Sequence, residues 1–296
     1  MKLKNSPHPY AFITSLCWSL AYALTRTASQ WLSAPSISAL RITIAAVVML
    51  AILLITRPGL PEKKDIPWFI LSGLSGTTIY MLTLSKGCAT VTTATGNVML
   101  AIPPIITAIA ARILFREQLQ RIQWCAIGIC FVGVIVLAVL SGGFSCNIGL
   151  LWLAFAVLAM STYNTVQRFL VGKYPPLAIT AYSTLFGALG LLVFLPNGIH
   201  QAVQAPARVW LCLLGLGLLS SSLGYCLWTK AFSKAKNAST VTNYMFINPF
   251  ISSFFGWILI NDPVERSAIY GGALIILGLL LFTFGSKLPR TDNSST

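Results

Sequence analysis

The sequence predicts an all-α polytopic membrane protein with ten transmembrane helices arranged as two inverted five-helix repeats. Three observations support this prediction: an apolar composition, apolar segments of bilayer-spanning length, and an internal repeat. Of the 296 residues, 56% are hydrophobic and only 9% are charged, whereas an ordinary soluble domain has roughly 25% charged residues. This composition is typical of a membrane protein.

The apolar residues form ten segments long enough to cross a bilayer, which takes about 17 to 25 helical residues. The cores of these segments lie near 10–28, 36–56, 66–86, 90–114, 121–141, 147–168, 176–196, 207–230, 238–260 and 267–286. Because the gaps between them are short, no separate soluble domain is expected.

The basic residues predict the orientation of these segments, since cytoplasmic loops are enriched in Lys and Arg. With a cytoplasmic N-terminus, 15 of the 20 Lys and Arg residues lie on the inner side. The five on the outer side are Arg26, Arg41, Lys86, Arg208 and Arg266. Both termini are therefore expected in the cytoplasm, which agrees with an even number of spans. The net charge of +14 is spread over short loops, so a nucleic-acid partner is not expected.

The first segment has an alternative interpretation, as a cleaved signal peptide. Lys2 and Lys4 precede an apolar stretch that contains AYA at 21–23, a pattern typical of secretory signals. The internal repeat favours a retained helix, because this segment has a counterpart in the second half of the chain.

The internal repeat has a period of about 145 residues. A shift of 145 residues aligns Pro104 with Pro249 and Arg121 with Arg266, and it places TATGNVMLAIPPI at 93–105 over ASTVTNYMFINPF at 238–250. The chain thus divides into halves at 1–141 and 142–296, each with five predicted spans. Because five is odd, the two halves have opposite orientations. Inverted repeats of this kind let a transporter expose one central site to each side in turn.

Ten spans, two five-span halves and the motif P…LFREQL…W…G…GV resemble the EamA-type members of the drug/metabolite transporter superfamily. The resemblance covers essentially the whole chain and is best between Gly96 and Leu137, where Pro104 and Glu117 match the family pattern. The second half keeps the proline but has Asp262 in place of the Glu. The resemblance implies export of amino acids or other small metabolites from a bacterial inner membrane. It also implies a site enclosed by the first four spans of each half.

The six acidic residues all lie in loops, at span ends or in the C-terminal tail. They are Glu62, Asp65, Glu117, Asp262, Glu265 and Asp292. Proton-coupled transporters usually contain a carboxylate inside the membrane, because burial raises its pKa toward the working range. The sequence therefore predicts a facilitator driven by the substrate gradient.

Enzymatic and metal-binding functions are not expected. The two histidines, His8 and His200, belong to no cluster with carboxylates, and no nucleophile motif is present. No catalytic residue, metal or cofactor is therefore predicted. The seven cysteines occur singly, without a CxxC pair, which indicates neither a zinc site nor a disulfide framework. Cys88 and Cys146 both fall near outer span ends, and whether they pair is left open.

Polar and aromatic residues near the middle of the predicted spans are candidates for lining a substrate cavity. They are Trp18, Ser19, Tyr22, Thr78, Tyr80, Asn97, Tyr163, Asn164, Ser222, Tyr225, Asn243 and Tyr244. Each has a structural alternative, since Ser and Thr in membrane helices commonly bond to backbone or allow close helix packing. Mid-span aromatics are often plain core. Asn is the stronger functional candidate, because its amide must find a partner away from lipid.

Arg41 and Arg26 are weaker candidates for binding a substrate carboxylate at the outer mouth. The alternative is that both side chains extend to the lipid head groups.

The prolines of the predicted fourth and ninth spans are expected to be bending points. Pro103 and Pro104 cannot donate to the Met99 and Leu100 carbonyls, which then need partners on other helices or in a cavity. Pro249 has the equivalent place in the second half. All three are predicted hinge residues.

The predicted function is that of an inner-membrane metabolite exporter that works by alternating access, for amino acids or similar small polar solutes. One alternative is an exporter of drugs or other hydrophobic and aromatic compounds. Another, of a different class, is a non-transporting membrane sensor or scaffold. The expected partners are a small-molecule substrate and the lipid bilayer; the choice between monomer and homodimer is left open.

Overall fold

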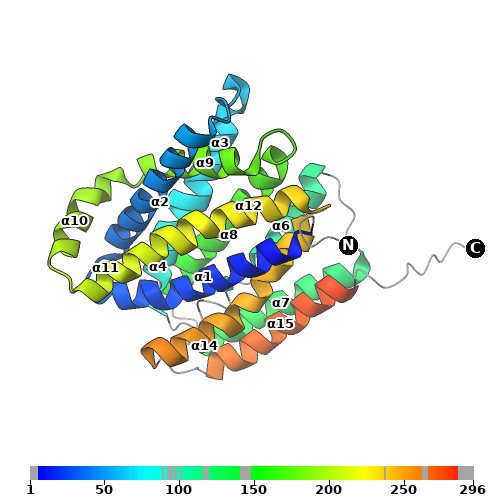
Figure 1. Cartoon of the computed structure of the whole chain (residues 1–296). Coiled ribbons are helices and arrows are strands. Elements are labelled where there is room, and N and C mark those ends of the chain that lie inside the picture. Colours follow the sequence, from blue (N-terminus) through cyan, green and yellow to red (C-terminus); the bar gives the residue numbers. More distant parts are fainter. Residues whose placement is uncertain are drawn as a thin grey trace, which may run out of the picture.

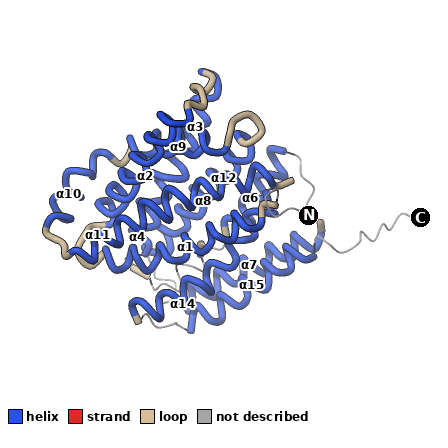
Figure 2. The backbone as a smooth tube through the Cα atoms, viewed as in Figure 1, coloured by secondary structure: helices blue, strands red, loops and turns tan. Residues whose placement is uncertain are grey.

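The computed structural model describes residues 6–88, 90–91, 96, 99–100, 102–115, 120–140, 148–236, 238–261 and 266–285. Helices make up nearly all of this part of the chain, and none of its residues lies in a β-strand (Figure 2). The predicted all-α class is confirmed.

Helices of the first half follow the predicted segments closely. In order they are α1 (His8–Ala28), α2 (Ala34–Thr56), the 3₁₀ turn η2 (Lys63–Asp65), α3 (Ile66–Gly73), the π-helix η3 (Leu74–Ile79), α4 (Tyr80–Cys88), α6 (Pro103–Phe115) and α7 (Arg121–Leu140). The α3, η3 and α4 segments form one uninterrupted run.

The second half has a similar order of helices. It consists of α8 (Ile148–Leu170), α9 (Pro176–Leu189), the 3₁₀ turn η4 (Leu192–Phe194), α10 (Leu195–Val203), α11 (Ala207–Leu214), the π-helix η5 (Gly215–Gly224), α12 (Tyr225–Lys234), α13 (Ala238–Thr242), the 3₁₀ segment η6 (Asn243–Ile247), α14 (Asn248–Ile260) and α15 (Arg266–Gly285). Here α11, η5 and α12 are continuous.

Prolines mark the starts of several helices. A proline occupies one of the first two positions of α2, α3, α9, α10 and α14, where its missing N–H would have no partner within the helix. The ends of α2 and α14 are marked by left-handed residues, Arg57 at φ 43° and Asn261 at φ 49°.

The proline pair of the first half lies at the start of α6. The predicted fourth span covers 90–114 with its bend at the prolines, and the structure has α6 beginning at Pro103, after the non-helical residue Ile102. The Met99 carbonyl accepts the N–H of Ile102 at 3.1 Å, which supplies a partner that the prolines cannot. Pro249 is likewise the second residue of α14. Whether these positions move during function stays a prediction.

Element boundaries recur along the chain. The helices α6 and α14 begin at Pro103 and Asn248, 145 positions apart. The helices α7 and α15 are described from Arg121 and Arg266, again 145 positions apart. Each half also contains a π-helical segment, a rare conformation that concentrates at functional sites.

Several described helices are apolar and long enough to cross a bilayer. Three meet this criterion by length and composition: Ala34–Thr56, Ile148–Leu170 and Ala207–Lys234. A fourth follows if Pro176–Leu189 and Leu192–Val203, bent by 53°, are counted as one span. Shorter apolar helices cover Pro103–Leu114, Arg121–Gly133 and Ile269–Phe282. The structure thus has several membrane-type helices, and the number ten stays a prediction.

The two halves interlock. The first-half helix α1 packs against α14, η5 and α12 of the second half. Conversely, α8 of the second half packs against α3, η3, α4 and α6 of the first. The last described helices of the halves, α7 and α15, run side by side (Figure 1), with Gly133 packed on Ile275 and Gly278 on Cys130.

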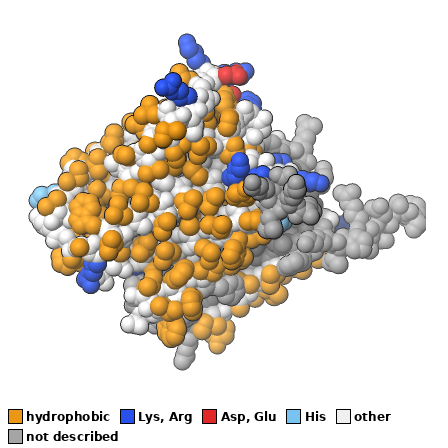
Figure 3. Space-filling view, in the orientation of Figure 1, with side chains coloured by type: hydrophobic (Ala, Val, Ile, Leu, Met, Phe, Trp, Pro, Cys, Tyr) orange, Lys and Arg blue, Asp and Glu red, His pale blue; other side chains and the backbone are white. Residues whose placement is uncertain are grey.

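The surface is dominated by hydrophobic side chains. Figure 3 shows a broad apolar face on which Lys and Arg occur only in a few places near the margins. Large apolar side chains such as Ile55, Val193 and Leu211 are 80%, 75% and 70% exposed. Such a surface is suited to lipid contact.

A polar cluster connects the start of α3 with the loop between α8 and α9. The Asp65 carboxylate accepts hydrogen bonds from the Tyr174 hydroxyl at 2.8 Å and the Lys173 ammonium at 3.0 Å. The Tyr174 hydroxyl, followed by Lys173, holds the pKa of Asp65 below its ordinary value. The Tyr174 hydroxyl also accepts the N–H of Glu62 at 3.2 Å, so the cluster anchors the segment that leads into α3.

Candidate functional site

A buried cavity lies where helices of the two halves meet. It has a volume of about 50 Å³ and is lined by residues of α1, α2, α4, η5, α12, η6 and α14, together with Leu100. A single water needs at least roughly 10 to 15 Å³ of such volume. In this conformation the cavity therefore has room for a few waters and not for an amino acid.

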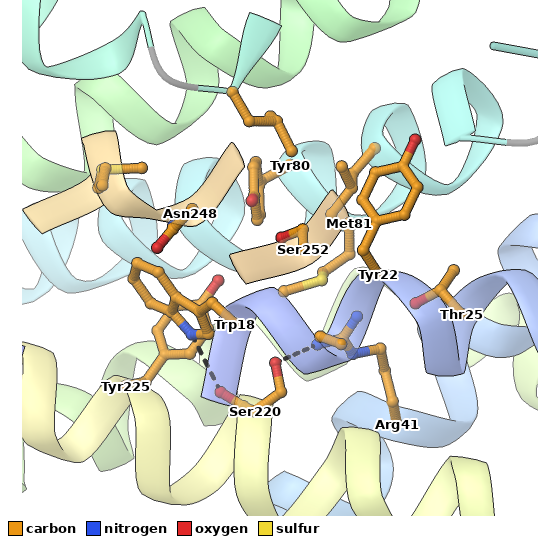
Figure 4. A pocket seen from close by; sticks show the side chains of 14 residues that line it. Trp18, Tyr22, Thr25, Arg41, Tyr80, Met81, Ser220, Tyr225, Asn248 and Ser252 are labelled. Atoms are coloured by element: carbon orange, nitrogen blue, oxygen red, sulfur yellow. Dashed lines mark hydrogen bonds between the residues drawn. The ribbon is translucent and has the colours of Figure 1, made fainter. Parts of the chain in front are cut away.

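Four of the predicted aromatic residues line the cavity: Trp18, Tyr22, Tyr80 and Tyr225. The Trp18 ring centroid lies 5.4 Å from that of Tyr225 and 4.8 Å from that of Trp228, so Trp18 and Tyr225 together form an aromatic wall. Figure 4 shows the four side chains around the cavity, with Tyr22 across the view from Trp18 and Tyr225.

Two of these aromatics bond to carbonyls of π-helical segments. The Trp18 indole N–H donates to the Ser220 carbonyl in η5 at 3.2 Å, and the Tyr225 hydroxyl donates to the Gly76 carbonyl in η3 at 2.7 Å. The wider hydrogen-bond pattern of a π-helix leaves such carbonyls accessible to side chains. Each π-helical segment thus accepts a bond from an aromatic residue of the other half.

Arg41 enters the cavity from α2. Its side chain is only 2% exposed, so it points into the protein and not to the surface. The guanidinium donates from Nε to Ser221 Oγ at 3.0 Å and from Nη2 to Ser220 Oγ at 2.9 Å. Because a guanidinium stays protonated in proteins, the cavity contains a fixed positive charge held by two hydroxyls. Arg26 does not line the cavity: it donates to the Val91 carbonyl at 3.3 Å.

Two polar residues of α14 also face the cavity: Asn248, a mid-span polar residue of the predicted ninth span, and Ser252, which the sequence did not single out. Asn248 and Ser252 are one turn apart, so they share a face of the helix, and they are 9% and 1% exposed. Within the described part of the chain, Asn248 Oδ1 and Ser252 Oγ have no hydrogen-bond partner. In the sequence, the signal for this face of the helix is a pair of polar residues four positions apart, next to the proline that starts the helix.

Three predicted hydroxyl residues serve packing instead of lining the cavity. Ser19 donates to the Asn248 carbonyl at 3.5 Å, Thr78 to the Gly187 carbonyl at 2.7 Å, and Ser222 to the Gly217 carbonyl at 2.8 Å. None of the three lines the cavity, and a role for them in binding stays a prediction.

Tyr163 and Asn164 lie outside the cavity lining, next to its aromatic wall. The Tyr163 ring packs on Tyr225, with centroids 5.5 Å apart. Asn164 is fully buried, and its Oδ1 accepts the indole N–H of Trp228 at 3.0 Å. Both residues support the wall, and neither lines the cavity.

The other predicted positions contribute less. The Tyr244 hydroxyl is hydrogen-bonded to His8 at 2.9 Å, and neither Tyr244 nor Asn243 lines the cavity. Asn97 and Cys146 lie outside the described residues, as does the side chain of Cys88.

A second, larger hollow of about 640 Å³ lies between α3, α6 and α8. Its lining is mostly apolar and includes Trp68, Leu114 and Leu158, which are 40%, 64% and 51% exposed. The hollow therefore opens on the apolar surface and is separate from the buried cavity.

Many membrane transporters consist of two packed halves with the substrate site at the interface between them. This protein has the same arrangement: its apolar helical halves pack together around a small polar and aromatic cavity. A model of the EamA-like transporter family matches residues 6–139 and again 147–284. The chain therefore belongs to this family of integral membrane transporters. The family and the names of its relatives indicate a transporter and not an enzyme.

Relatives similar over nearly their whole length have names of the same kind. An uncharacterized transporter of Archaeoglobus fulgidus is 25% identical, with 91% of this chain and 95% of that protein covered. A protein of Streptantibioticus cattleyicolor named as a probable terminal-alkyne amino-acid exporter is 25% identical (96% and 95% covered). The pseudopaline exporter CntI of Pseudomonas aeruginosa is 24% identical (94% and 95% covered).

The fold is also found in a solved crystal structure. The two structures superpose with a TM-score of 0.68 at 18% sequence identity, and the match covers 98% of this chain and 99% of the other. At this identity the likeness concerns the fold alone.

Proposed function

We propose that this protein exports amino acids or similar small solutes that bear a carboxylate, across a bacterial inner membrane and by alternating access. The observation that supports this most directly is the buried Arg41 guanidinium in the cavity between the two halves. Ionisable groups inside membrane proteins usually belong to functional sites. A relative named for amino-acid export supports the same class of cargo.

Arg41 suits a carboxylate for a chemical reason. A guanidinium presents donors in a planar fork that matches the two oxygens of a carboxylate, and such charge-assisted bonds are stronger than neutral ones. Ser220 and Ser221 hold the guanidinium by two of its nitrogens. Its orientation is thus set before a substrate arrives, which reduces the entropy lost on binding.

The proposed mechanism uses ten spans in two inverted repeats with both termini in the cytoplasm. Three features support it: the spacing of 145 residues between the starts of α6 and α14, a π-helical segment in each half, and the reciprocal packing of α1 and α8. No acidic residue lies within a predicted span. We therefore expect the substrate gradient, and not a proton gradient, to drive transport.

Arg41→Gln tests the proposal in proteoliposomes that contain the full chain and a labelled amino-acid mixture. Losing bonds between a charged donor and the substrate costs roughly 1.5 to 3 kcal/mol, so apparent affinity should fall roughly 10- to 100-fold. Arg41→Lys should recover part of it. The control is Arg57→Gln, an exposed arginine just after the same helix, which should transport normally. Arg41→Gln with wild-type affinity and wild-type thermal stability would contradict the proposal.

Export of hydrophobic compounds is the second candidate, and the apolar hollow between α3, α6 and α8 is the observation that favours it. Its volume of about 640 Å³ is within the roughly 300 to 1,000 Å³ usual for ligand pockets. Competition of amino acids against aromatic cations separates the two candidates, since only the first predicts inhibition by amino acids that depends on Arg41.

A further inference from the structure

We infer that Asn248 and Ser252 bind the ammonium group of the substrate, so that the cavity selects zwitterionic amino acids over simple carboxylic acids. This inference rests on the proposed function, because it takes Arg41 as the carboxylate site. It assigns a second, opposite subsite to residues of α14.

The α14 face of the cavity offers acceptors that are buried and unused. Asn248 Oδ1 and Ser252 Oγ both lack a hydrogen-bond partner among the described residues, although both side chains are at least nine-tenths buried and line the cavity. Burying a polar atom without a partner destabilises a fold. Buried polar atoms without a protein partner are commonly satisfied by water or by a bound ligand.

The two sides of the cavity have complementary chemistry. The Arg41 guanidinium can only donate hydrogen bonds, whereas the Asn248 amide oxygen can only accept them. A carboxylate therefore suits the first and an ammonium the second. Figure 4 shows Arg41 with Ser220 on one side of the view and Asn248 with Ser252 on the other.

Aromatic rings add to the attraction for a cation. Trp18, Tyr80 and Tyr225 line the same cavity as Asn248 and Ser252, and an ammonium gains energy over the face of such rings. A molecule with a carboxylate and an ammonium a few atoms apart matches this arrangement better than either charge alone.

The test measures how well three probes inhibit labelled amino-acid counterflow in proteoliposomes: L-phenylalanine, 3-phenylpropionate, which lacks the ammonium, and phenethylamine, which lacks the carboxylate. L-leucine with its two analogues forms a second series. We expect the amino acid to inhibit about tenfold more strongly than its des-amino analogue, as one lost charge-assisted bond implies. In the double variant that carries both Asn248→Ala and Ser252→Ala, the preference for the amino acid over its des-amino analogue should disappear. Inhibition by the des-amino analogue should stay unchanged.

Thermal stability separates a binding role from a structural one. Because Asn248 Oδ1 and Ser252 Oγ lack partners, Ser252→Ala and the double variant should melt at or above the wild-type temperature. The control is Ser15→Ala, which removes a buried hydroxyl that donates to the Tyr244 carbonyl at 3.0 Å and does not line the cavity. It should melt lower and keep the wild-type preference.

The failures are distinguishable. If no amino acid or carboxylate competes in the wild type, the proposed function is wrong. If the amino acid and its des-amino analogue compete equally well, the α14 subsite is wrong while the proposed function stands. The same conclusion follows if the double variant keeps the wild-type preference.

Discussion

Replacing Gly187 by alanine should destabilise the protein, because α9 touches the α3–η3 run at this residue. A Cβ at position 187 would lie 2.5 Å from the Gly73 carbonyl oxygen and 2.5 Å from Thr77 Cβ. Non-bonded heavy atoms prefer separations of about 3.5 to 4.0 Å, so the helices would have to separate by roughly 1 Å. One of the clashing atoms belongs to the backbone, so no side-chain rotation relieves the contact.

Overpacking of this kind costs typically about 1 to 3 kcal/mol. Separation of the helices would also lengthen the 2.7 Å bond from Thr78 Oγ1 to the Gly187 carbonyl. At roughly 2 to 4 °C per kcal/mol, the melting temperature of purified Gly187→Ala in detergent should fall by roughly 2 to 12 °C.

Gly128→Ala is the matched control. A Cβ at this position of α7 meets no described atom within 4 Å, and alanine is favoured over glycine in a helix by up to about 1 kcal/mol. Its melting temperature should stay level or rise. Equal stability of the wild type and Gly187→Ala, or a drop of the same size in Gly128→Ala, would refute the packing argument.

Three further predictions concern other parts of the molecule. Tyr174 and Lys173 hold the pKa of Asp65 below its ordinary 3.8, so their contribution is present above about pH 4 and lost as pH falls through the lowered value. Asp65→Asn should therefore melt below the wild type at pH 7, and the difference in melting temperature should narrow as the pH falls below about 4; a difference independent of pH would contradict this. Trp228→Phe leaves Asn164 Oδ1 without its donor and should cost about 1 to 3 kcal/mol, whereas Asn164→Leu in that background should add little, as a double-mutant cycle would show. Finally, counterflow in proteoliposomes should proceed without an imposed pH gradient, and transport that stops without one would overturn the facilitator prediction.

Much of the fold follows from the apolar pattern of the sequence. Long apolar segments predict helices because a helix satisfies its backbone hydrogen bonds within one segment, as lipid requires, and proline marks helix starts such as Pro176 and Pro249. The aromatic wall was also predictable in part. Trp18 and Tyr22 are four residues apart, so they share a face of α1, and both line the cavity.

The polar part of the site was harder to predict. Whether Arg41 extends to lipid or into the protein depends on Ser220 and Ser221, about 180 positions away in the chain. The 3₁₀ segment η6 between α13 and α14 changes the angle per residue. A constant period of 3.6 residues therefore misplaces the faces of this region, and Asn248, not Asn243, lines the cavity.

Two reciprocal contacts determine what must change when the cavity opens. Trp18 from the first half bonds to the Ser220 carbonyl in η5, and Tyr225 from the second half bonds to the Gly76 carbonyl in η3. A cavity of about 50 Å³ has no room for an amino acid, so under the proposed function the walls of the cavity must move apart. A motion that separates α1 from η5, or α12 from η3, would break one of these bonds. In a π-helix the carbonyl of residue i also accepts the N–H of residue i+5, so a carbonyl that loses its side-chain donor keeps a backbone partner and is not left unpaired in an apolar surrounding.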